Sequence, residues 1–480
     1  MKLASGTTLA QAVVLVTAPV ITRLYDPSQF GAATLFASVS GILIVVGCLR
    51  YDLSIVLPES DEDGAAQLWL SLLLSLLLGA GAFAILSLLP ASILGKVGAD
   101  EIPFYSLLVG LAIVIGSGLS ALTYWNSRKR RFGRVGAARV ANTSVTALAQ
   151  TGAGVLGGGS GALVVGSLAG TATATVLLAA QSALANGQVL ARNLRFGRML
   201  SGARQHWRFP VFNTWSALLN TMSWQLPALV LGVYFGSATV GFYSLGYRVL
   251  ALPMSMVGGA IAQVFYQHAA VSLRAGGLRS LVQGVFSVLV DLGLLPFATL
   301  AIAGKEVFIV AFGAQWAEAG VYVQILSIAT FVTFVSSPMS TLYPVLDQQA
   351  RALWLNAAIL LSRLAALAIG GWVGSPSIAL ALFAATGLML YGYMNQYIMT
   401  QSGVPLSAVG RIVGRACLRA VVPCVAIAAL VVTGVGATWV FAACVVAIAA
   451  NTLWMVRRWR DLLRSGKSPA SDAPTGATAS

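Results

Sequence analysis

Charged side chains are scarce in this sequence. Of its 480 residues only 9% are Asp, Glu, Lys or Arg, whereas 58% are hydrophobic. That is too little polar surface to cover a soluble globule of this length, so a water-soluble fold is excluded. The composition predicts an all-α membrane protein that crosses the bilayer many times.

Residues that usually build catalytic or metal sites are also few. The two histidines are His206 and His268, and the four cysteines lie in apolar stretches rather than at metal-ligand spacing: Cys48, Cys417, Cys424 and Cys444. The sequence shows no glycine-rich phosphate loop and no spacing typical of a nucleophile with its base. We therefore expect no metal site, no organic cofactor and no enzyme activity.

Hydrophobic runs long enough to cross a membrane recur along the chain. We expect fourteen spans, at residues 4–22, 31–57, 66–89, 103–125, 135–156, 161–184, 209–234, 239–267, 280–302, 318–345, 352–373, 376–400, 412–432 and 436–456. They predict an N-terminal six-helix lobe (1–184), a basic linker (185–208), a C-terminal six-helix lobe (209–400), two further helices (401–456) and a polar, disordered cytoplasmic tail (457–480). The short loops leave no room for a catalytic domain outside the membrane.

Basic residues gather on one side of these spans. If the N-terminus is cytoplasmic, the basic clusters at 128–139, 192–208, 411–419 and 457–467 are cytoplasmic too, and only Arg23, Lys96 and Lys305 fall on the outer side. This asymmetry follows the positive-inside rule and predicts that both termini are cytoplasmic. Basic loops spread along one membrane face would contact anionic lipid, which argues against nucleic acid as a partner despite the net charge of +15.

The two lobes carry a weak internal repeat. An offset of 210 residues places Phe30-Gly31 on Val240-Gly241 and Leu35 on Leu245, and in each copy a short outer turn joins two spans. An even number of spans per lobe gives both lobes the same orientation. The repeat therefore predicts a pseudo-twofold axis along the membrane normal, with the lobes around a central cavity.

Five ionisable residues lie inside the predicted spans: Arg50, Asp52, Arg248, Asp291 and Arg363. The last three lie roughly 14 to 17 Å deep, near the bilayer midplane, whereas Arg50 and Asp52 lie further along the apolar helix 31–57, toward the far leaflet. Charges at such depths are costly and mark candidate functional sites. Because arginine stays charged and binds phosphate bidentately, the set favours an anionic ligand such as the phosphates of a lipid headgroup.

Structural roles remain open for each of these residues. Arg50 and Asp52 could reach the interface and fix only the depth of their helix, and Arg363 could pair with Asp291. Tyr247 is a candidate for stacking on sugars, although tyrosines near span ends also serve as interfacial anchors. Asp291 and Asp52 are the acidic candidates for binding a coupling ion.

Two stretches resemble a known family. SGTTLAQAVVLVTAPVITRLYDPSQFGAATLF (residues 5–36), followed by LRYDLSIVLPESDEDGAAQL (residues 49–68), is similar to the start of bacterial polysaccharide-biosynthesis membrane proteins of the O-antigen flippase type. These belong to the superfamily of multidrug, oligosaccharidyl-lipid and polysaccharide exporters. The resemblance implies a two-lobed, V-shaped bundle in the bacterial inner membrane that moves undecaprenyl-diphosphate-linked glycans from the cytoplasmic to the periplasmic leaflet by alternating access.

The resemblance also implies site residues and partners. Flippases of this superfamily carry cavity arginines on their first, second and eighth helices, which correspond here to Arg23, Arg50 and Arg248, although Arg23 is expected at the outer rim. A coupling cation, Na⁺ or H⁺, is implied too, but no acidic cluster in the C-terminal lobe marks its site. A glycan polymerase and a chain-length regulator of the same pathway are the protein partners to expect.

Competing functions remain open at this stage. A cation-coupled multidrug exporter of the same superfamily would favour acidic cavity residues, whereas the buried set here holds more arginine than aspartate. A membrane-embedded glycan polymerase or ligase would carry a large periplasmic loop, and the predicted outer loops are short. A purely structural scaffold does not account for charges near the bilayer midplane.

Overall fold

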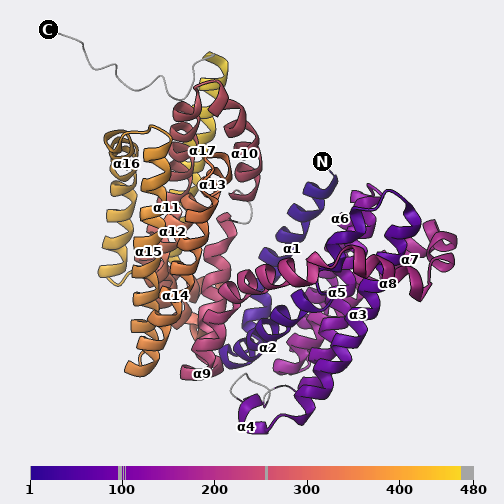
Figure 1. The fold of residues 1–480 in the computed structure, drawn as a ribbon. Coiled ribbons are helices and arrows are strands. Elements are labelled where there is room, and N and C mark those ends of the chain that lie inside the picture. The colour runs from indigo at the N-terminus through magenta and orange to yellow at the C-terminus, as the bar shows by residue number, and fades with distance from the viewer. Residues whose placement is uncertain (1, 96–99, 101, 103, 255–257, 466–480) are drawn as a thin grey trace. The chain divides into compact units, whose positions relative to one another are not determined.

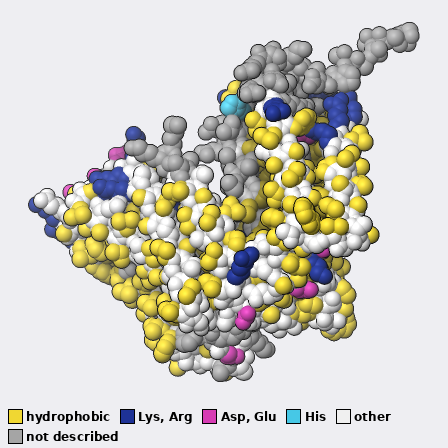
Figure 2. Space-filling model, turned by 180° about the vertical axis from the view of Figure 1, so that it is seen from behind, with side chains coloured by type: hydrophobic (Ala, Val, Ile, Leu, Met, Phe, Trp, Pro, Cys, Tyr) yellow, Lys and Arg dark blue, Asp and Glu magenta, His cyan; other side chains and the backbone are white. Residues whose placement is uncertain are grey.

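The fold is built from helices, most of them long and apolar. The computed structural model describes residues 2–95, 100, 102, 104–254 and 258–465, and these contain helices but no strand. Within these described residues, twelve helices are long and apolar enough to cross a membrane. Many large hydrophobic side chains face outward, including Leu88, Leu184 and Trp372, and hydrophobic side chains cover much of the visible surface (Figure 2). Apolar side chains turned outward are what a lipid environment requires, so the protein is an all-α, multi-pass membrane protein.

The chain divides into two compact units, Met1–Ser244 and Leu245–Ser480. The first holds α1 (Lys2–Leu24), α2 (Pro27–Val46), the 3-10 helix η1 (Tyr51–Val56), α3 (Asp61–Leu88), α4 (Ala91–Leu94), α5 (Tyr105–Arg128), α6 (Phe132–Val155), α7 (Ser160–Arg192), α8 (Phe196–Gln205), η4 (Phe209–Asn213) and most of α9 (Thr214–Pro253). The second holds the end of α9, then α10 (Gly259–Arg274), α11 (Leu278–Phe312), η6 (Ala314–Trp316), α12 (Ala317–Met339), α13 (Leu342–Val345), α14 (Gln349–Val373), α15 (Pro376–Gln401), α16 (Leu406–Val432) and α17 (Ala437–Ser465).

The first unit packs around α5 (Figure 1). Helix α5 contacts α2, α3 and α7, while α6 lies against both α1 and α7. A core cluster joins Ile55 of η1 to Leu68, Trp125 and Leu178. Trp125 and Ile55 are fully buried. This core fixes η1 between α3 and α5, and η1 carries Asp52.

Helix α2 crosses the last part of α9 at unusually short range. A Cβ atom on Gly31 would overlap the carbonyl oxygen of Ser237, and one on Gly241 would overlap that of Pro27. Thr34 Oγ1 also donates a hydrogen bond of 3.1 Å to Ser244 Oγ, across a separation of 210 residues. Gly31 and Gly241 are separated by the same number of residues, so the crossing relates counterparts of the predicted repeat through a local twofold.

The second unit packs around α11 and α12. Helix α12 lies between α11 and α15, α14 covers α15, and α16 and α17 both pack on α11 (Figure 1). Aromatic side chains fill its interior, with Phe297, Phe308, Phe334 and Trp316 fully buried. The two helices after residue 401 are therefore packed onto the second unit through α11.

Several predicted spans differ in their details. The expectation of one continuous helix over residues 31–57 is wrong, because α2 ends at Val46. The predicted spans 209–234 and 239–267 meet at a bend in α9, where Gly236 has a φ of 82°. Helix α6 corresponds to the predicted span 135–156 but is not among the twelve apolar candidates, so the count of fourteen stays a prediction. Helix α17 continues to Ser465, and the predicted tail beyond it lies outside the described residues.

Candidate functional site

The chain makes a strained turn between α2 and η1. Leu49 and Arg50 adopt left-handed backbone conformations, with φ of 45° and 59°. Such a conformation costs a residue with a side chain about 1 to 3 kcal/mol, and strain of this kind concentrates at functional sites. The turn ends α2 and directs Asp52 toward Ser120 on α5. In a continuous helix, Arg50 and Asp52 would instead lie within an apolar membrane span.

Asp52 is buried beside Ser120. Its side chain is 4% exposed, and Ser120 Oγ on α5 donates a hydrogen bond of 2.6 Å to Asp52 Oδ2. Arg50 Nη1 lies 3.9 Å from the same oxygen, which is an ion pair beyond hydrogen-bonding distance. Among the described residues, Asp52 Oδ1 and Arg50 Nε have no hydrogen-bond partner. The structure thus brings Arg50 and Asp52 together as a loosely held pair.

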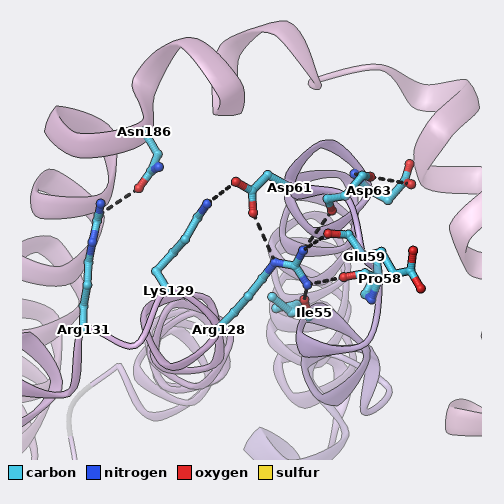
Figure 3. Close-up of polar contacts among 10 residues, drawn as sticks. Ile55, Pro58, Glu59, Asp61, Asp63, Arg128, Lys129, Arg131 and Asn186 are labelled. Carbon is cyan, nitrogen blue, oxygen red and sulfur yellow. Dashed lines mark hydrogen bonds and ion pairs between the residues drawn. The ribbon is translucent and has the colours of Figure 1, made fainter.

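Arg128, the last residue of α5, holds the loop that follows η1 (Figure 3). Its guanidinium donates to the carbonyl oxygens of Ile55 at 3.3 Å, Pro58 at 2.5 Å, Glu59 at 3.2 Å and Ser60 at 3.0 Å. A guanidinium holds several N–H donors in a fixed arrangement, so this one side chain can bind several carbonyls of the loop at once.

Acidic residues at the start of α3 bind basic residues around it. Asp61 pairs with Lys129 and lies 3.6 Å from Arg128 Nε. Arg198 on α8 donates to Glu62 at 2.5 Å, and this carboxylate raises the pKa of the Arg198 guanidinium. Tyr51 on η1 donates a hydrogen bond of 3.0 Å to the carbonyl of Ala203 on α8. The basic linker is therefore attached to the segment that carries Asp52.

In the second unit, Arg363 lies in an aromatic setting. It is buried on α14, its Nη2 donates 3.3 Å to the Tyr391 hydroxyl on α15, and its guanidinium carbon lies 5.0 Å from the centre of the Phe383 ring. Tyr247 interacts electrostatically with both Arg363 and Tyr391. Two predicted site residues, Arg363 and Tyr247, therefore belong to one cluster.

Asp291 has a basic partner that the sequence did not single out. It forms an ion pair with Arg419 on α16, and Arg419 also lies over the Trp454 ring of α17 at 4.6 Å. Asn451 donates to the backbone carbonyl of Asp291 at 3.4 Å. Asp291 therefore joins α11 to the last two helices, and its role in ion coupling stays a prediction.

The remaining predicted arginines lie elsewhere. Arg23 is exposed in the last turn of α1. It precedes α2 and Arg50 follows it, so a helix of 20 residues, about 30 Å long, separates the two. Arg248 is exposed near the end of α9. The structure does not gather Arg23 and Arg50 into one group.

Two groups of side chains offer hydrogen-bond donors to an anion: Arg50 with Ser120, and Arg363 with Tyr391. Within the described part of the chain, no three His, Cys, Asp or Glu side chains lie close enough to hold a metal ion. Ser120, Tyr391 and Arg419 were missed in the sequence because two are neutral and the third was assigned to a predicted cytoplasmic loop. A guanidinium among hydroxyls and aromatic rings suits a phosphate group.

Comparisons with known proteins agree with this arrangement. The chain is 24% identical over 368 residues to the succinoglycan biosynthesis transport protein ExoT of Rhizobium meliloti (strain 1021), covering 75% of this chain and 71% of that protein. The lipid II flippase MurJ, in an inward closed conformation, has the same fold, with a TM-score of 0.67 at 12% identity over 96% of this chain and 99% of the other.

A more distant likeness is to an outward-facing multidrug resistance MATE family transporter of the MOP superfamily, with a TM-score of 0.50 at 12% identity over 84% of this chain and 94% of the other. Residues 20–321 match the family described as polysaccharide biosynthesis protein. This match spans α2, η1 and the Arg50–Asp52 pair, and it confirms the resemblance found in the opening stretches. The chain belongs to the polysaccharide biosynthesis protein family.

Proposed function

We propose that this protein is a flippase that moves an undecaprenyl-diphosphate-linked oligosaccharide from the cytoplasmic to the periplasmic leaflet for surface polysaccharide biosynthesis. The observation that carries the proposal is the family match over residues 20–321. The relatives named as a polysaccharide transport protein and as a lipid II flippase support a lipid-linked glycan as the substrate class. Alternating access is the mechanism, and catalysis plays no part.

Four arginines are the proposed phosphate ligands. Arg363 lies with Tyr391, Tyr247 and Phe383, where aromatic rings can stack on sugars while the guanidinium binds phosphate. Arg50 is held to Asp52 only at 3.9 Å, so it can turn to another anion. Arg248 and Arg23 are further candidates through their place on α9 and α1.

A leaflet-accessibility assay tests the function. Spheroplasts with and without the protein would be treated with a membrane-impermeant reagent that modifies the undecaprenyl-linked glycan, and the modified fraction would be measured. We expect modification to require the protein. Loss of one charged hydrogen-bonding group to phosphate is worth about 1.5 to 3 kcal/mol, so Arg363→Ala and Arg50→Ala should reduce transport at limiting substrate roughly tenfold or more.

The matched control is Arg274→Ala, an exposed arginine at the end of α10 outside the proposed site, which should transport normally. If the glycan reaches the outer leaflet equally well without the protein, the proposed function is wrong and drug export becomes the alternative. If transport needs the protein but tolerates both alanines, the function stands and the assigned ligands are wrong.

A further inference from the structure

Three tyrosine rings stack where α13, α14 and α15 come together. The centre of the Tyr397 ring on α15 lies 6.4 Å from that of Tyr343 on α13 and 6.4 Å from that of Tyr393, with interplanar angles of 13° and 25°. Tyr393 and Tyr397 share one face of α15, because side chains four residues apart are neighbours on a helix. The stack therefore joins the end of α15 to the short helix α13.

The beginning of α14 holds this stack in place. The guanidinium carbon of Arg351 lies 4.1 Å from the centre of the Tyr397 ring, and Arg351 Nη1 donates a hydrogen bond of 3.2 Å to the Tyr393 hydroxyl. The Tyr397 hydroxyl donates at 3.0 Å to Oε1 of Gln348, whose amide donates at 2.8 Å to the carbonyl of Tyr343. Because these side chains already fix one another, a ligand that binds them costs little further conformational entropy.

One edge of the cluster is open to a ligand. Tyr393 is 49% exposed and Arg351 is exposed too, whereas Tyr343 is buried. The Tyr393 hydroxyl accepts from Arg351, so its own proton can still be donated to a ligand. The Tyr343 hydroxyl is buried and has no hydrogen-bond partner among the described residues. Burying a hydroxyl in this way is costly, and a water molecule or a ligand hydroxyl can remove that cost.

The chemistry of the open edge suits a neutral sugar ring. A sugar has C–H groups on its faces, which pack on an aromatic ring, and hydroxyls around its rim, which both donate and accept hydrogen bonds. Tyr393 supplies the ring and Arg351 supplies donors. The turn that leads into α14 also carries the exposed carboxylate of Asp347, and α15 carries no charged residue. The opposite charges of Asp347 and Arg351 make this place less favourable for a phosphate than for an uncharged ligand.

We propose that Tyr393 and Arg351 bind a sugar of the lipid-linked glycan on the cytoplasmic side, before the glycan is transported. The inference rests on the proposed function, because the glycan is that of the flippase substrate. In the predicted topology ten spans precede the turn between α13 and α14, so this turn lies on the same side of the membrane as the cytoplasmic N-terminus. The glycan is on that side when transport begins.

The sugar site is separate from the proposed phosphate ligand on the same helix. Arg363 lies twelve residues after Arg351 on α14, which corresponds to about 18 Å along a helix. Both arginines face α15, since Arg363 donates to Tyr391 and Arg351 donates to Tyr393. A glycan whose phosphates are bound at Arg363 can therefore extend along α14 and α15 and place a sugar on Tyr393.

Binding measurements on the purified full-length protein test the inference. Two probes would be compared in the same detergent: the undecaprenyl-linked oligosaccharide extracted from the cells that produce this protein, and undecaprenyl diphosphate without a sugar. We expect the wild type to bind the glycan-bearing probe roughly tenfold more tightly, and Tyr393→Ala to bind the two probes equally. Tyr393→Trp keeps an aromatic face and should keep the preference for the glycan.

Tyr234→Ala is the matched control. Tyr234 on α9 is 50% exposed, as Tyr393 nearly is, but lies outside the cluster, so both affinities should stay at the wild-type values. If Tyr393→Ala does not fold, Arg351→Gln takes its place as the deciding variant, because it removes the guanidinium from the same open edge and should weaken the preference for the glycan.

The possible outcomes lead to distinct conclusions. Equal affinity of the wild type for the two probes overturns the sugar site and leaves the flippase proposal, which the leaflet assay tests, intact. A preference that persists in folded Tyr393→Ala, or in Arg351→Gln, overturns the site and makes these tyrosines interfacial anchors. Loss of the preference in Tyr234→Ala as well shows that the effect does not come from the cluster. Failure of both probes to bind overturns the sugar site together with the proposed substrate.

Discussion

At the scale of single residues, Arg128 shows why an arginine cannot be replaced by another cation. Its planar guanidinium serves four backbone carbonyls between Ile55 and Ser60 at once, and it is 9% exposed. A lysine keeps the charge but cannot reproduce this fixed arrangement of donors. We expect Arg128→Lys to lower the free energy of unfolding by about 2 kcal/mol, measured by thermal or denaturant unfolding in detergent.

The control for this prediction is Arg192→Lys. Arg192 is exposed at the end of α7, and a surface substitution of this kind should stay within about 0.5 kcal/mol of the wild type. Equal stability of Arg128→Lys and Arg192→Lys would show that the charge of Arg128, and not its hydrogen-bonding geometry, holds the loop.

Single residues also show how far the sequence can predict the site. Arg50, Asp52, Asp291 and Arg363 stand out because a charge in an apolar span is rare and costly. Their partners could not be predicted, because the position of Ser120 relative to Asp52 depends on how α5 packs against η1. The same holds for Asp291, whose partner lies on a helix 128 residues further along the chain.

At the scale of helices, the crossing of α2 with α9 depends on two glycines. Gly31 and Gly241 bring their backbones together so closely that any side chain would overlap a carbonyl oxygen of the other helix. We expect Gly31→Ala and Gly241→Ala each to destabilise the protein by about 1 to 3 kcal/mol, as overpacking in a rigid contact does. The measurement is again the free energy of unfolding in detergent.

Gly81→Ala is the matched control for the crossing. Gly81 lies within α3 with open space around its Cα, so alanine there should stabilise the helix by about 0.5 to 1 kcal/mol. If Gly31→Ala behaves like Gly81→Ala, the two helices do not pack as closely as the structure indicates.

The repeat offset of 210 residues was visible in the sequence, and it predicts which residues are counterparts. That counterparts would contact each other, as Thr34 and Ser244 do, could not be predicted from it. The end of α2 at Val46 could not be predicted either, because Gly47, which follows it, keeps a right-handed conformation, and the left-handed residues of the turn are Leu49 and Arg50, where glycine would be usual.

At the scale of the whole molecule, helix α6 determines how many times the chain crosses the membrane. It is less apolar than the twelve candidate helices, yet its 24 residues are about 36 Å long, enough to cross the hydrocarbon core. Arg131, before α6, donates to Asn186 near the end of α7 at 2.8 Å, and Arg134 donates to the Gln181 carbonyl at 2.8 Å. Near the other end, Gln150 donates to the carbonyl of Leu163 at 2.8 Å.

These contacts show that α6 runs antiparallel to α7 along most of its own length, so we expect α6 to cross where α7 crosses. Thiol labelling tests this in a background whose four cysteines are replaced by serine. We expect Gly133→Cys, in the first turn of α6, and Gly197→Cys, in the first turn of α8, to react with a membrane-impermeant maleimide only in inverted vesicles, because both belong to the predicted cytoplasmic face. Gly159→Cys, between α6 and α7, should react only in intact spheroplasts. If Gly133→Cys and Gly159→Cys react from the same side, α6 does not cross: reaction of both from the cytoplasm puts the basic linker after α7 on the outer side, and reaction of both from outside does so for the basic loop before α6.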